Sequence, residues 1–433
     1  MGKNRGVVMN KKILVITLLS IVTGLVIFNI ANQKENAIKE TEKPITNSNM
    51  LTMMLETEAG TGNYEEVTQS EWPQDGYVFN ESLSRCENGG TLSWNDVAKK
   101  VIMESNSSDK CYIYFNLEPK ILLTEYIINE VYTTDGENGL YYHDGVGSYT
   151  NATEEAGDNS YRYSGANPNN YVCFGSDAAT CPNDNLYRII GFFDDDKDGI
   201  YNTKLIKYDY ITSEMLGTNG RDYAGTYSSH TSYYMGNMNT SNIAEYRWNY
   251  DTSVSNRGSN DWTTSELNKI NLNTNYIKYL NSIDEKWVDM IATTTWHLGG
   301  MTSYSNTAKE FYEGERNNTG YGDNPTLYSG EIGLMYVSDY GYAAAPSNWI
   351  TDLNDYASGI ARFNNWMYMG LVEWTLNPYF DSNNGVFNLD DLGDLDHTGA
   401  NTGYGVRPAF YLESSVVLTG GTGNSSDPYR IQI

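Results

Sequence analysis

The feature that most constrains this chain is one long apolar stretch near its start. Residues 13–30 read ILVITLLSIVTGLVIFNI and carry no charged side chain. Four basic residues precede this stretch: Lys3, Arg5, Lys11 and Lys12. A helix needs ~17–25 apolar residues to cross a bilayer, and basic flanks stay in the cytoplasm. We therefore predict a cytoplasmic flank at residues 1–12, a transmembrane signal anchor at 13–31, and an extracellular remainder on the cell membrane.

A cleaved signal peptide is the alternative for the same stretch. Such peptides have an apolar core of ~7–15 residues followed by small residues at the cleavage site. The run here is longer, and its exit, Asn29-Ile30-Ala31-Asn32, lacks a small residue three positions before the cut. Length and exit sequence both favour the uncleaved anchor.

The charge balance excludes one class of partner. The net charge is -27, and the mean hydropathy of -0.53 is that of a soluble chain. Because a strongly acidic surface repels phosphate backbones, we expect no nucleic-acid partner. The acidity fits an extracellular surface, either simply for solubility or with some binding of divalent cations.

The four cysteines all follow the apolar stretch: Cys86, Cys111, Cys173 and Cys181. An even number of cysteines in an exported chain predicts disulfides, and four allow three pairings. We expect Cys86–Cys111 and Cys173–Cys181, because each of these pairs falls within one local module.

The rest of the chain divides by composition into four predicted segments. Residues 32–63 are polar and predict a stalk. Residues 64–119 contain short β-like runs separated by turn formers, which predict a small β module stapled by its disulfide. Residues 120–136 have helical apolar spacing and predict a linker helix. Residues 137–433 form one large domain, because no linker-like stretch divides them.

The sequence pattern of the large domain predicts an α+β fold. Long loops rich in Tyr, Asn, Gly and Ser separate many short strands and few helices. Strands are expected at 185–193, 203–208, 332–338, 385–389, 406–412, 415–419 and 429–433, and helices at 265–280, 284–293 and 306–313. The segment from 210 to 261 lacks apolar periodicity and predicts a long functional loop.

Three motifs carry a family resemblance: Arg188-Ile189-Ile190-Gly191, Trp374-Thr375-Leu376-Asn377-Pro378 and Gly405-Val406-Arg407-Pro408-Ala409. This ordered set resembles a family of exported bacterial surface proteins of unknown function. It is also similar to the wider C-type-lectin-like superfamily, which includes formylglycine-generating-type domains. The resemblance covers roughly residues 137–433. It implies a small twisted antiparallel sheet with paired terminal strands, a few helices and long loops that carry binding.

Two departures limit what the resemblance implies. The chain has no cysteine after Cys181, so the cysteine chemistry of the oxidase members is not carried over. Calcium-dependent lectins pair Glu-Pro-Asn or Gln-Pro-Asp with a later Trp-Asn-Asp. Here Trp94-Asn95-Asp96 lies in the first module without such a partner. The sugar site of those lectins is therefore not carried over either.

One segment suggests a calcium site. Asp194, Asp196 and Asp198 alternate before Gly199, which is how a calcium loop begins, and Asn202 follows as a further oxygen donor. Leu205 stands where such a loop needs a bidentate Glu. The alternative is a solvated hairpin turn, for which Asp-Gly is a favoured sequence.

Aromatic residues in the last third are candidate ligand contacts. Trp349, Tyr336 and Trp366 could stack on a sugar or anchor a protein partner, and Trp349, in a Pro-Ser-Asn loop, is expected to be exposed. Trp374 and Arg407 lie inside the family motifs and are expected to be structural.

These observations favour a binding protein over an enzyme. The histidines are scattered, and no nucleophile or zinc motif occurs, so no catalytic residue is assigned. The leading hypothesis is a membrane-tethered protein that recognises a glycan or a surface protein through loops around 210–260 and 340–385. The alternatives are a carboxylate-based glycoside hydrolase and a structural envelope protein without a discrete ligand.

Overall fold

The computed structural model describes residues 51–433 apart from 68–75, 96, 99, 105–108, 133, 136, 146–153, 196 and 228–232. The predicted flank, anchor and first part of the stalk lie outside these residues. Within them, no helix is both long enough and apolar enough to span a bilayer. The chain separates into two compact units, and the boundary between them in the sequence lies between Lys120 and Ile121.

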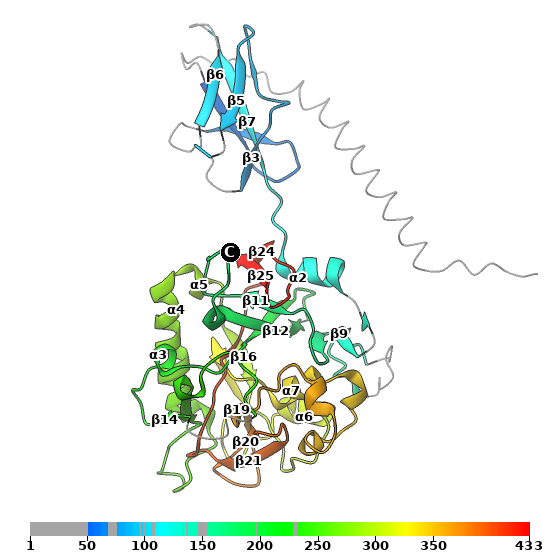
Figure 1. The fold of residues 1–433 in the computed structure, drawn as a ribbon, viewed down its shortest axis with the longest axis vertical. Helices are drawn as coiled ribbons and strands as arrows, with labels where there is room; N and C mark the ends of the chain where they lie inside the picture. The colour runs from blue at the N-terminus through cyan, green and yellow to red at the C-terminus, as the bar shows by residue number, and fades with distance from the viewer. Residues whose placement is uncertain are drawn as a thin grey trace, which may run out of the picture. The chain divides into compact units, whose positions relative to one another are not determined.

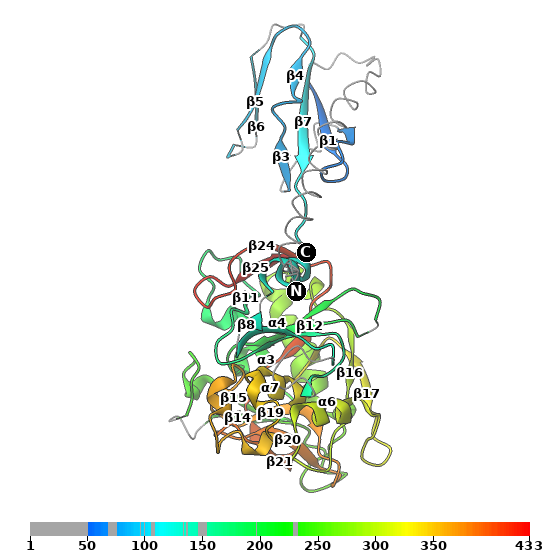
Figure 2. The ribbon, with the colours of Figure 1, turned by 90° about the vertical axis from the view of Figure 1, so that its right-hand side faces the viewer.

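The first unit is a mixed β-sheet with an added hairpin, drawn in blue and cyan in Figure 2. The strand order in the sheet is β2 (Tyr64–Val67), β1 (Leu51–Glu56), β7 (Cys111–Leu117) and β3 (Tyr77–Phe79). A further strand, β4 (Arg85–Cys86), also pairs with β7. The hairpin consists of β5 (Thr91–Asn95) and β6 (Lys100–Glu104). Strand β1 runs parallel to β7. Residues 51–56 were expected in the stalk but form a strand inside the sheet, because Met53 packs with Ile113 and Phe115.

The first unit has a very small core, which explains the value of its disulfide. Three residues, Met53, Ile113 and Phe115, make up its buried apolar cluster. The predicted Cys86–Cys111 disulfide is confirmed and joins β4 to β7. A crosslink of this kind stabilises a small unit mainly by restricting its unfolded state, typically by about 2–4 kcal/mol.

The second unit is built on one large, mostly antiparallel sheet (Figure 1). Its main path is β18 (Ile332–Gly333), β23 (Ala409–Tyr411), β13 (Asn202–Lys207), β12 (Leu186–Phe193), β10 (Tyr161–Ser164), β9 (Asn138–Tyr142) and β8 (Thr134–Asp135). Beside it, β11 (Tyr171–Cys173) pairs with β12 and with β25 (Tyr429–Gln432), which pairs with β24 (Val417–Gly420). The predicted α+β class is confirmed.

Strand β12 is the buried spine of this sheet. All eight of its residues are buried, which is why its sequence reads as an apolar run without alternation. Its register shifts between Ile189 and Gly191. A side chain at Gly191 would place a Cβ 2.3 Å from the carbonyl oxygen of Tyr161 on β10. The glycine therefore allows the two backbones to approach.

Three smaller sheets complete the unit. They are β14 (Tyr223–Thr226) with β15 (Ala244–Arg247) and β22 (Gly403–Tyr404), β16 (Thr294–His297) with β17 (Leu327–Gly330), and β19 (Glu373–Pro378) with β20 (Gly385–Leu389) and β21 (Leu395–Gly399). In Figure 1, β20 and β21 lie at the opposite end of this unit from β24 and β25. The prediction of one long loop from 210 to 261 was wrong, because β14 and β15 lie inside it.

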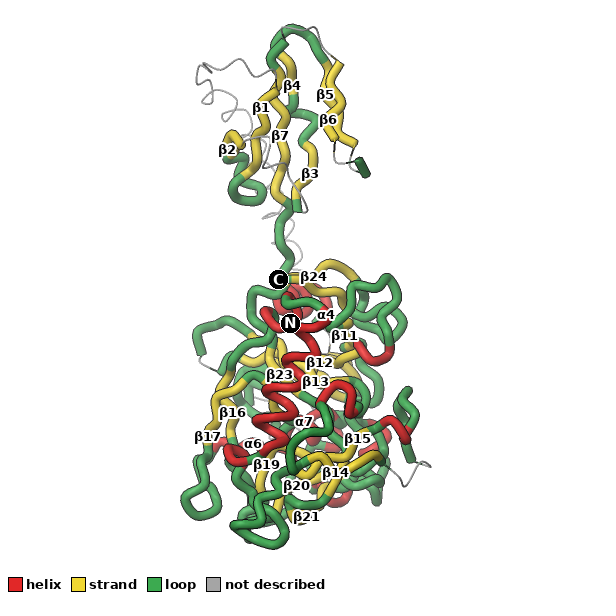
Figure 3. The backbone as a smooth tube through the Cα atoms, turned by 90° about the vertical axis from the view of Figure 1, so that its left-hand side faces the viewer, coloured by secondary structure: helices red, strands yellow, loops and turns green. Residues whose placement is uncertain are grey.

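Short helices pack around the sheets (Figure 3). They are α2 (Leu123–Tyr126) with a π-helical turn at Ile127–Val131, α3 (Ser213–Leu216), a π-helical segment at Leu267–Tyr276 that continues as α4 (Ile277–Ile283), α5 (Lys286–Asp289), α6 (Ala308–Arg316) and α7 (Val337–Ala343). Single 3-10 turns lie at Asn183–Asn185, Thr240–Asn242, Trp262–Thr264, Pro346–Asn348, Leu353–Asp355 and Ala361–Asn364. The three predicted helices are confirmed in position.

Helix α7 replaces most of a predicted strand. Of residues 332–338 only Ile332 and Gly333 are strand, and the helix begins after Tyr336. The carboxylate of Asp339 accepts a hydrogen bond from the Tyr336 N–H at 2.8 Å, which caps the first turn. This cap overrides the strand preference of the Met-Tyr-Val sequence.

Two residues of the sequence motifs, Arg407 and Trp374, lie in the core and connect segments that are far apart in the chain. Arg407 donates to both carboxylate oxygens of Glu373, at 2.8 and 2.7 Å, and to the carbonyl oxygen of Met367 at 2.7 Å. Trp374 is buried, and its indole N–H donates to the carbonyl oxygen of Tyr246 at 2.7 Å. The structural roles predicted for Arg407 and Trp374 are confirmed.

We expect Arg407→Met to lower the free energy of unfolding of the second unit by about 3–5 kcal/mol, because it leaves the Glu373 carboxylate buried without its partner. Urea unfolding followed by tryptophan fluorescence measures the change. The matched control is Lys286→Met, which breaks the ion pair with the exposed Asp177 and should cost under about 1 kcal/mol. Equal losses in both variants would contradict the dominance of the buried pair.

Candidate functional site

The three predicted ligand-binding aromatics are core residues. Trp349, Tyr336 and Trp366 are 0%, 2% and 4% exposed. The expectation that Trp349 is exposed was therefore wrong. A buried ring cannot stack on an external ligand while the fold is intact, so these side chains stabilise the domain.

Trp349 is turned inward by the 3-10 turn that precedes it. Its indole N–H donates to the carbonyl oxygen of Ala344 at 3.0 Å. Its ring lies 4.9 Å from the His143 ring and 5.5 Å from the Tyr342 ring. Burial lowers the pKa of His143 to about 3, so that imidazole is neutral and behaves as another core ring.

Tyr336 and Trp366 are held by equally specific contacts. The Tyr336 hydroxyl accepts the backbone N–H of His297 at 2.8 Å, and burial raises the pKa of that hydroxyl. The Trp366 indole donates to the carbonyl oxygen of Tyr163 at 2.7 Å. The guanidinium of Arg188 lies 4.5 Å from the centre of the Trp366 ring, a cation–π contact in the core.

The aspartate-rich segment forms the turn between β12 and β13. Asp194 accepts hydrogen bonds from the N–H groups of Asp198 and Gly199, each at 3.0 Å, and Asp198 accepts one from Ile200 at 2.8 Å. The Asn202 side-chain amide donates to the carbonyl oxygen of Leu412 at 3.1 Å. These described carboxylates close a turn on their own backbone.

The candidate calcium site stays a prediction, since Asp196 lies outside the described residues. Within the part of the chain that is described, the only converging group of three His, Cys, Asp or Glu side chains is Cys86, Asp109 and Cys111. Its two sulfurs form the disulfide, and the Asp109 oxygens accept the N–H groups of Asn88 and Gly90.

An open hollow of about 240 Å³ is the best candidate for a binding site. Three segments that are far apart in the sequence line it: residues 251–264, 321–324 and Asn383. Its lining includes three asparagines and three aspartates together with apolar surface, and it contains no Lys or Arg among the described residues. Tyr321 lines it and is 38% exposed. We refer to this feature as the amide hollow.

Asn260 holds the three segments of the amide hollow together. It is buried, and its side-chain amide donates to the carbonyl oxygens of Ser382 at 2.8 Å and Tyr379 at 3.3 Å. Its side-chain oxygen accepts the Asn324 amide at 2.8 Å. Its backbone N–H donates to the carbonyl oxygen of Asn383 at 3.0 Å. One side chain thus fixes two neighbouring loops.

The floor beneath the amide hollow is aromatic. The rings of Trp248 and Trp262 lie 4.8 Å apart, and both line a small adjoining cavity together with Asn260, Tyr321 and Asn324. That cavity has a volume of about 10 Å³, close to the space that one water molecule or hydroxyl group needs. The buried Trp262 N–H has no hydrogen-bond partner among the described residues. A donor therefore remains unused at the base of the site.

Two of the three aspartates that line the amide hollow, Asp251 and Asp261, are committed to local turns. Asp251 accepts the N–H and hydroxyl of Ser253 at 3.0 and 2.6 Å, and these hydrogen bonds lower the pKa of Asp251. Asp261 accepts the N–H and hydroxyl of Thr263 at 2.9 and 2.6 Å. A general acid needs a raised pKa, so Asp251 does not suit that role.

A short ladder of stacked aromatic rings includes Tyr379, whose carbonyl oxygen accepts the Asn260 amide. The ring of His397 stacks on that of Tyr379 at 3.9 Å and on that of Tyr304 at 5.5 Å. Tyr304 is 39% exposed, and the Tyr379 carbonyl oxygen is one of the Asn260 acceptors. The ladder therefore supports the segment that accepts the Asn260 amide.

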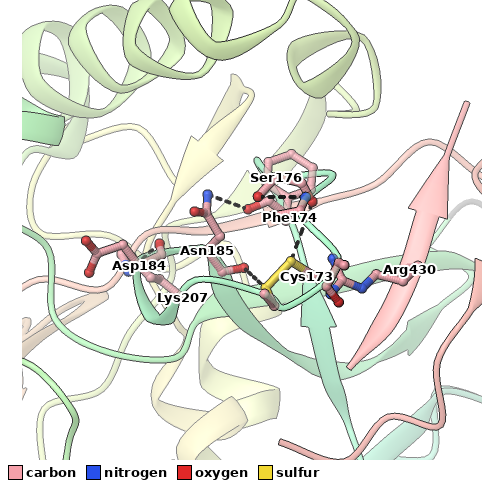
Figure 4. Close-up of a disulfide and its surroundings, with 10 residues drawn as sticks. Cys173, Phe174, Ser176, Asp184, Asn185, Lys207 and Arg430 are labelled. Atoms are coloured by element: carbon pink, nitrogen blue, oxygen red, sulfur yellow. Dashed lines mark hydrogen bonds between the residues drawn. A yellow bond between two sulfur atoms is a disulfide. The ribbon is translucent and has the colours of Figure 1, made fainter. Parts of the chain in front are cut away.

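A second hollow, of about 280 Å³, lies beside the Cys173–Cys181 disulfide. The predicted pairing of these two cysteines is confirmed. Figure 4 shows Cys173 and Arg430 next to each other on β11 and β25, and the Arg430 guanidinium donates to the carbonyl oxygen of Ala179 at 3.0 Å. The one tryptophan in this hollow, Trp287, is buried. It therefore offers no exposed aromatic face.

The sequence analysis predicted some of the segments that line the amide hollow and missed one of them. The expected binding loops at 210–260 and 340–385 contribute residues 251–260 and Asn383. The segment around Tyr321 was missed. Its sequence, NNTGYGDNP, carries the turn-forming composition of an exposed loop around one aromatic residue, and that signal could have identified it.

Comparison with known proteins gives no assignment: no protein-family model matches the chain, and no curated protein or solved structure matches it.

We expect Trp349→Ala to lower the free energy of unfolding of the second unit by about 3–5 kcal/mol, because it removes a buried ring from the core. The neighbouring Ile350 is 57% exposed, so Ile350→Ala should change stability by less than about 0.5 kcal/mol. Thermal and urea unfolding of both variants measure the difference. A Trp349→Ala protein as stable as the parent would show that the ring is not a core residue.

Proposed function

We propose that this is an extracellular binding protein, tethered to a membrane by residues 13–31, whose second unit recognises a neutral glycan at the amide hollow. The observation that carries the proposal is the hollow itself, with Asn260 fixing its loops and Tyr321 exposed on it. The finer assignment of this unit to a C-type-lectin-like fold is part of the proposal.

The extracellular assignment is supported by the sequence and by the disulfides. The apolar stretch at residues 13–30 follows a basic flank, as in a signal anchor. Both pairs of cysteines are oxidised, and no free cysteine remains. Disulfides persist mainly in oxidising compartments, which include the outer surface of a cell.

The fold assignment is supported by the pairing of the ends of the second unit. Strand β25 runs beside β11 and β24, and Leu122, at the start of the unit, forms a bridge with Val417. The last residues of the chain thus return to the segment where the unit begins. The many loops outside the main sheet are then free to form a binding surface, as the resemblance to C-type-lectin-like domains implies.

The chemistry of the amide hollow favours a neutral, hydroxyl-rich ligand. Asn324 and Asn383 line the hollow, and asparagine side chains can both donate to and accept from sugar hydroxyls. The Asn260 amide is used within the protein, so it shapes the hollow. An aromatic ring packs against the apolar face of a sugar. The absence of basic residues from the described lining and the net charge of -27 disfavour sulfated or sialylated ligands. A neutral glycan therefore fits better than an anionic one.

We expect Tyr321→Ala to weaken glycan binding about tenfold, because it removes the exposed ring while leaving the Asn260 scaffold in place. Full-length protein in detergent would be screened on a glycan array, and the best neutral ligand measured by calorimetry, with calcium and with chelator. Phe363→Ala is the control, since Phe363 is 57% exposed and does not line the amide hollow.

Three results would contradict parts of this proposal. Binding of anionic glycans alone would contradict the predicted selectivity. Loss of binding with chelator would move the site to the aspartate turn at 194–202. Equal weakening by Tyr321→Ala and Phe363→Ala would remove the amide hollow as the binding site, and no glycan binding at all would overturn the proposed function.

A further inference from the structure

A lysine and an aspartate meet in the core of the second unit, away from any hollow. Lys204 lies on β13, and Asp339 lies in the first turn of α7. The Lys204 Nζ is 2.6 Å from Asp339 Oδ2, and the two side chains are 0% and 1% exposed. A pair this deeply buried is costly to keep charged, because both ions have lost their water.

Aromatic rings enclose the lysine. Its Nζ lies 4.0 Å from the centre of the Tyr336 ring and 5.2 Å from that of Trp296. The rings of Tyr411 and Phe193 follow at 5.3 and 5.9 Å. Burial in this cage lowers the pKa of Lys204. Burial thus lowers the cost of removing a proton from this amine, and the deprotonated amine is the nucleophilic form of lysine.

The two oxygens of Asp339 have different surroundings. Oδ2 faces the lysine and also accepts the Tyr336 N–H at 2.8 Å. Oδ1 is buried with no hydrogen-bond partner among the described residues, and Arg162 Nη1 lies 3.7 Å away. Arg162 in turn pairs with Asp158 at 2.7 Å. An incompletely satisfied oxygen is a poor place for a full carboxylate charge, whereas a nearby guanidinium would stabilise charge that develops on it during a reaction.

A third ionisable group, Glu315, lies close to the pair. It is buried at the end of α6, and its carboxylate accepts the N–H and hydroxyl of Ser338 at 2.9 and 2.5 Å, next to Asp339 in the chain. Burial raises the pKa of Glu315 to about 7 despite the neighbouring Arg316, and the charge of Glu315 acts on both Lys204 and Asp339. Its carboxylate pairs with Arg316 at 3.1 Å, and among the described residues no ion pair joins it to Lys204, so its influence on the pair is electrostatic.

We propose that Lys204 and Asp339 are a self-modification site, at which the two side chains condense into an intramolecular isopeptide bond. The lysine passes a proton to Oδ2 of the aspartate, and the neutral Nζ attacks Cγ. The nitrogen of the resulting adduct then gives its remaining excess proton to the departing Oδ2. The C–Oδ2 bond breaks, an N–Cγ amide forms, and one water molecule leaves without any oxidant or cofactor.

Arg162 is a positioning residue for this step. It faces Oδ1, which becomes the amide oxygen, while its other side is paired with Asp158. The condensation replaces two buried ions by one amide, which removes the desolvation cost of both charges. The new bond would connect β13, inside the main sheet, to α7, 135 residues further along the chain. A crosslink of that kind would protect an exported domain against unfolding.

Intact mass spectrometry of the purified, disulfide-reduced full chain tests the proposal. The expected mass is lower than the sequence mass by one water molecule, and digestion should yield one branched peptide that contains Lys204 and Asp339. The full sequence mass in correctly folded protein would overturn the proposal and leave the pair as an ion pair. This readout does not depend on glycan binding, so it is separate from the proposed function.

Three variants assign the chemistry to residues. Lys204→Met should restore the full mass, whereas Lys286→Met, which removes a lysine from a partly exposed ion pair, should keep the loss of water. Asp339→Ala removes the carbon that the amine attacks, so this variant should also have its full sequence mass. Loss of one water molecule in either Lys204→Met or Asp339→Ala would overturn the site.

Discussion

The arrangement of the second unit depends on buried charged side chains in its core. Lys204 from the main sheet meets Asp339 from α7, and Arg162 from β10 approaches the same carboxylate. Breaking a buried pair from one side costs about 3–5 kcal/mol, because it leaves an uncompensated ion in the core. These contacts therefore fix α7 against two strands of the sheet in one arrangement, whether the lysine and aspartate remain an ion pair or become an amide.

A second buried ion pair, between Arg407 and Glu373, also holds two segments of the second unit together. Arg407 and Glu373 connect the segment before β23 to β19, and Arg407 also reaches the carbonyl oxygen of Met367. Arg188, in the Arg188-Ile189-Ile190-Gly191 motif, is buried against Trp366 and Tyr171. The recognisable motifs are thus structural residues. They describe a scaffold, and the amide hollow is built from loops in which none of them takes part.

The sequence predicted the elements whose signal is local. Strands β12, β13 and β20 were predicted within one or two residues, because their apolar runs end at turn formers. Both disulfides follow from proximity along the chain. Helix α7 was missed because its strand-like residues are overridden by the Asp339 cap. Trp349 was expected outside because its loop is polar, yet the 3-10 turn directs its ring toward His143 and Tyr342.

By itself the sequence determined the α+β class, the cysteine pairs, the residues of the structural motifs and the acidic character of the chain. Each of these depends on composition, or on residues close together in the chain. Only the tertiary structure decided that Asn260 joins loops more than 60 residues apart at the amide hollow, and that Lys204 meets Asp339. The physical reason is that burial and the approach of distant side chains depend on how the sheets pack, and no local pattern encodes that packing.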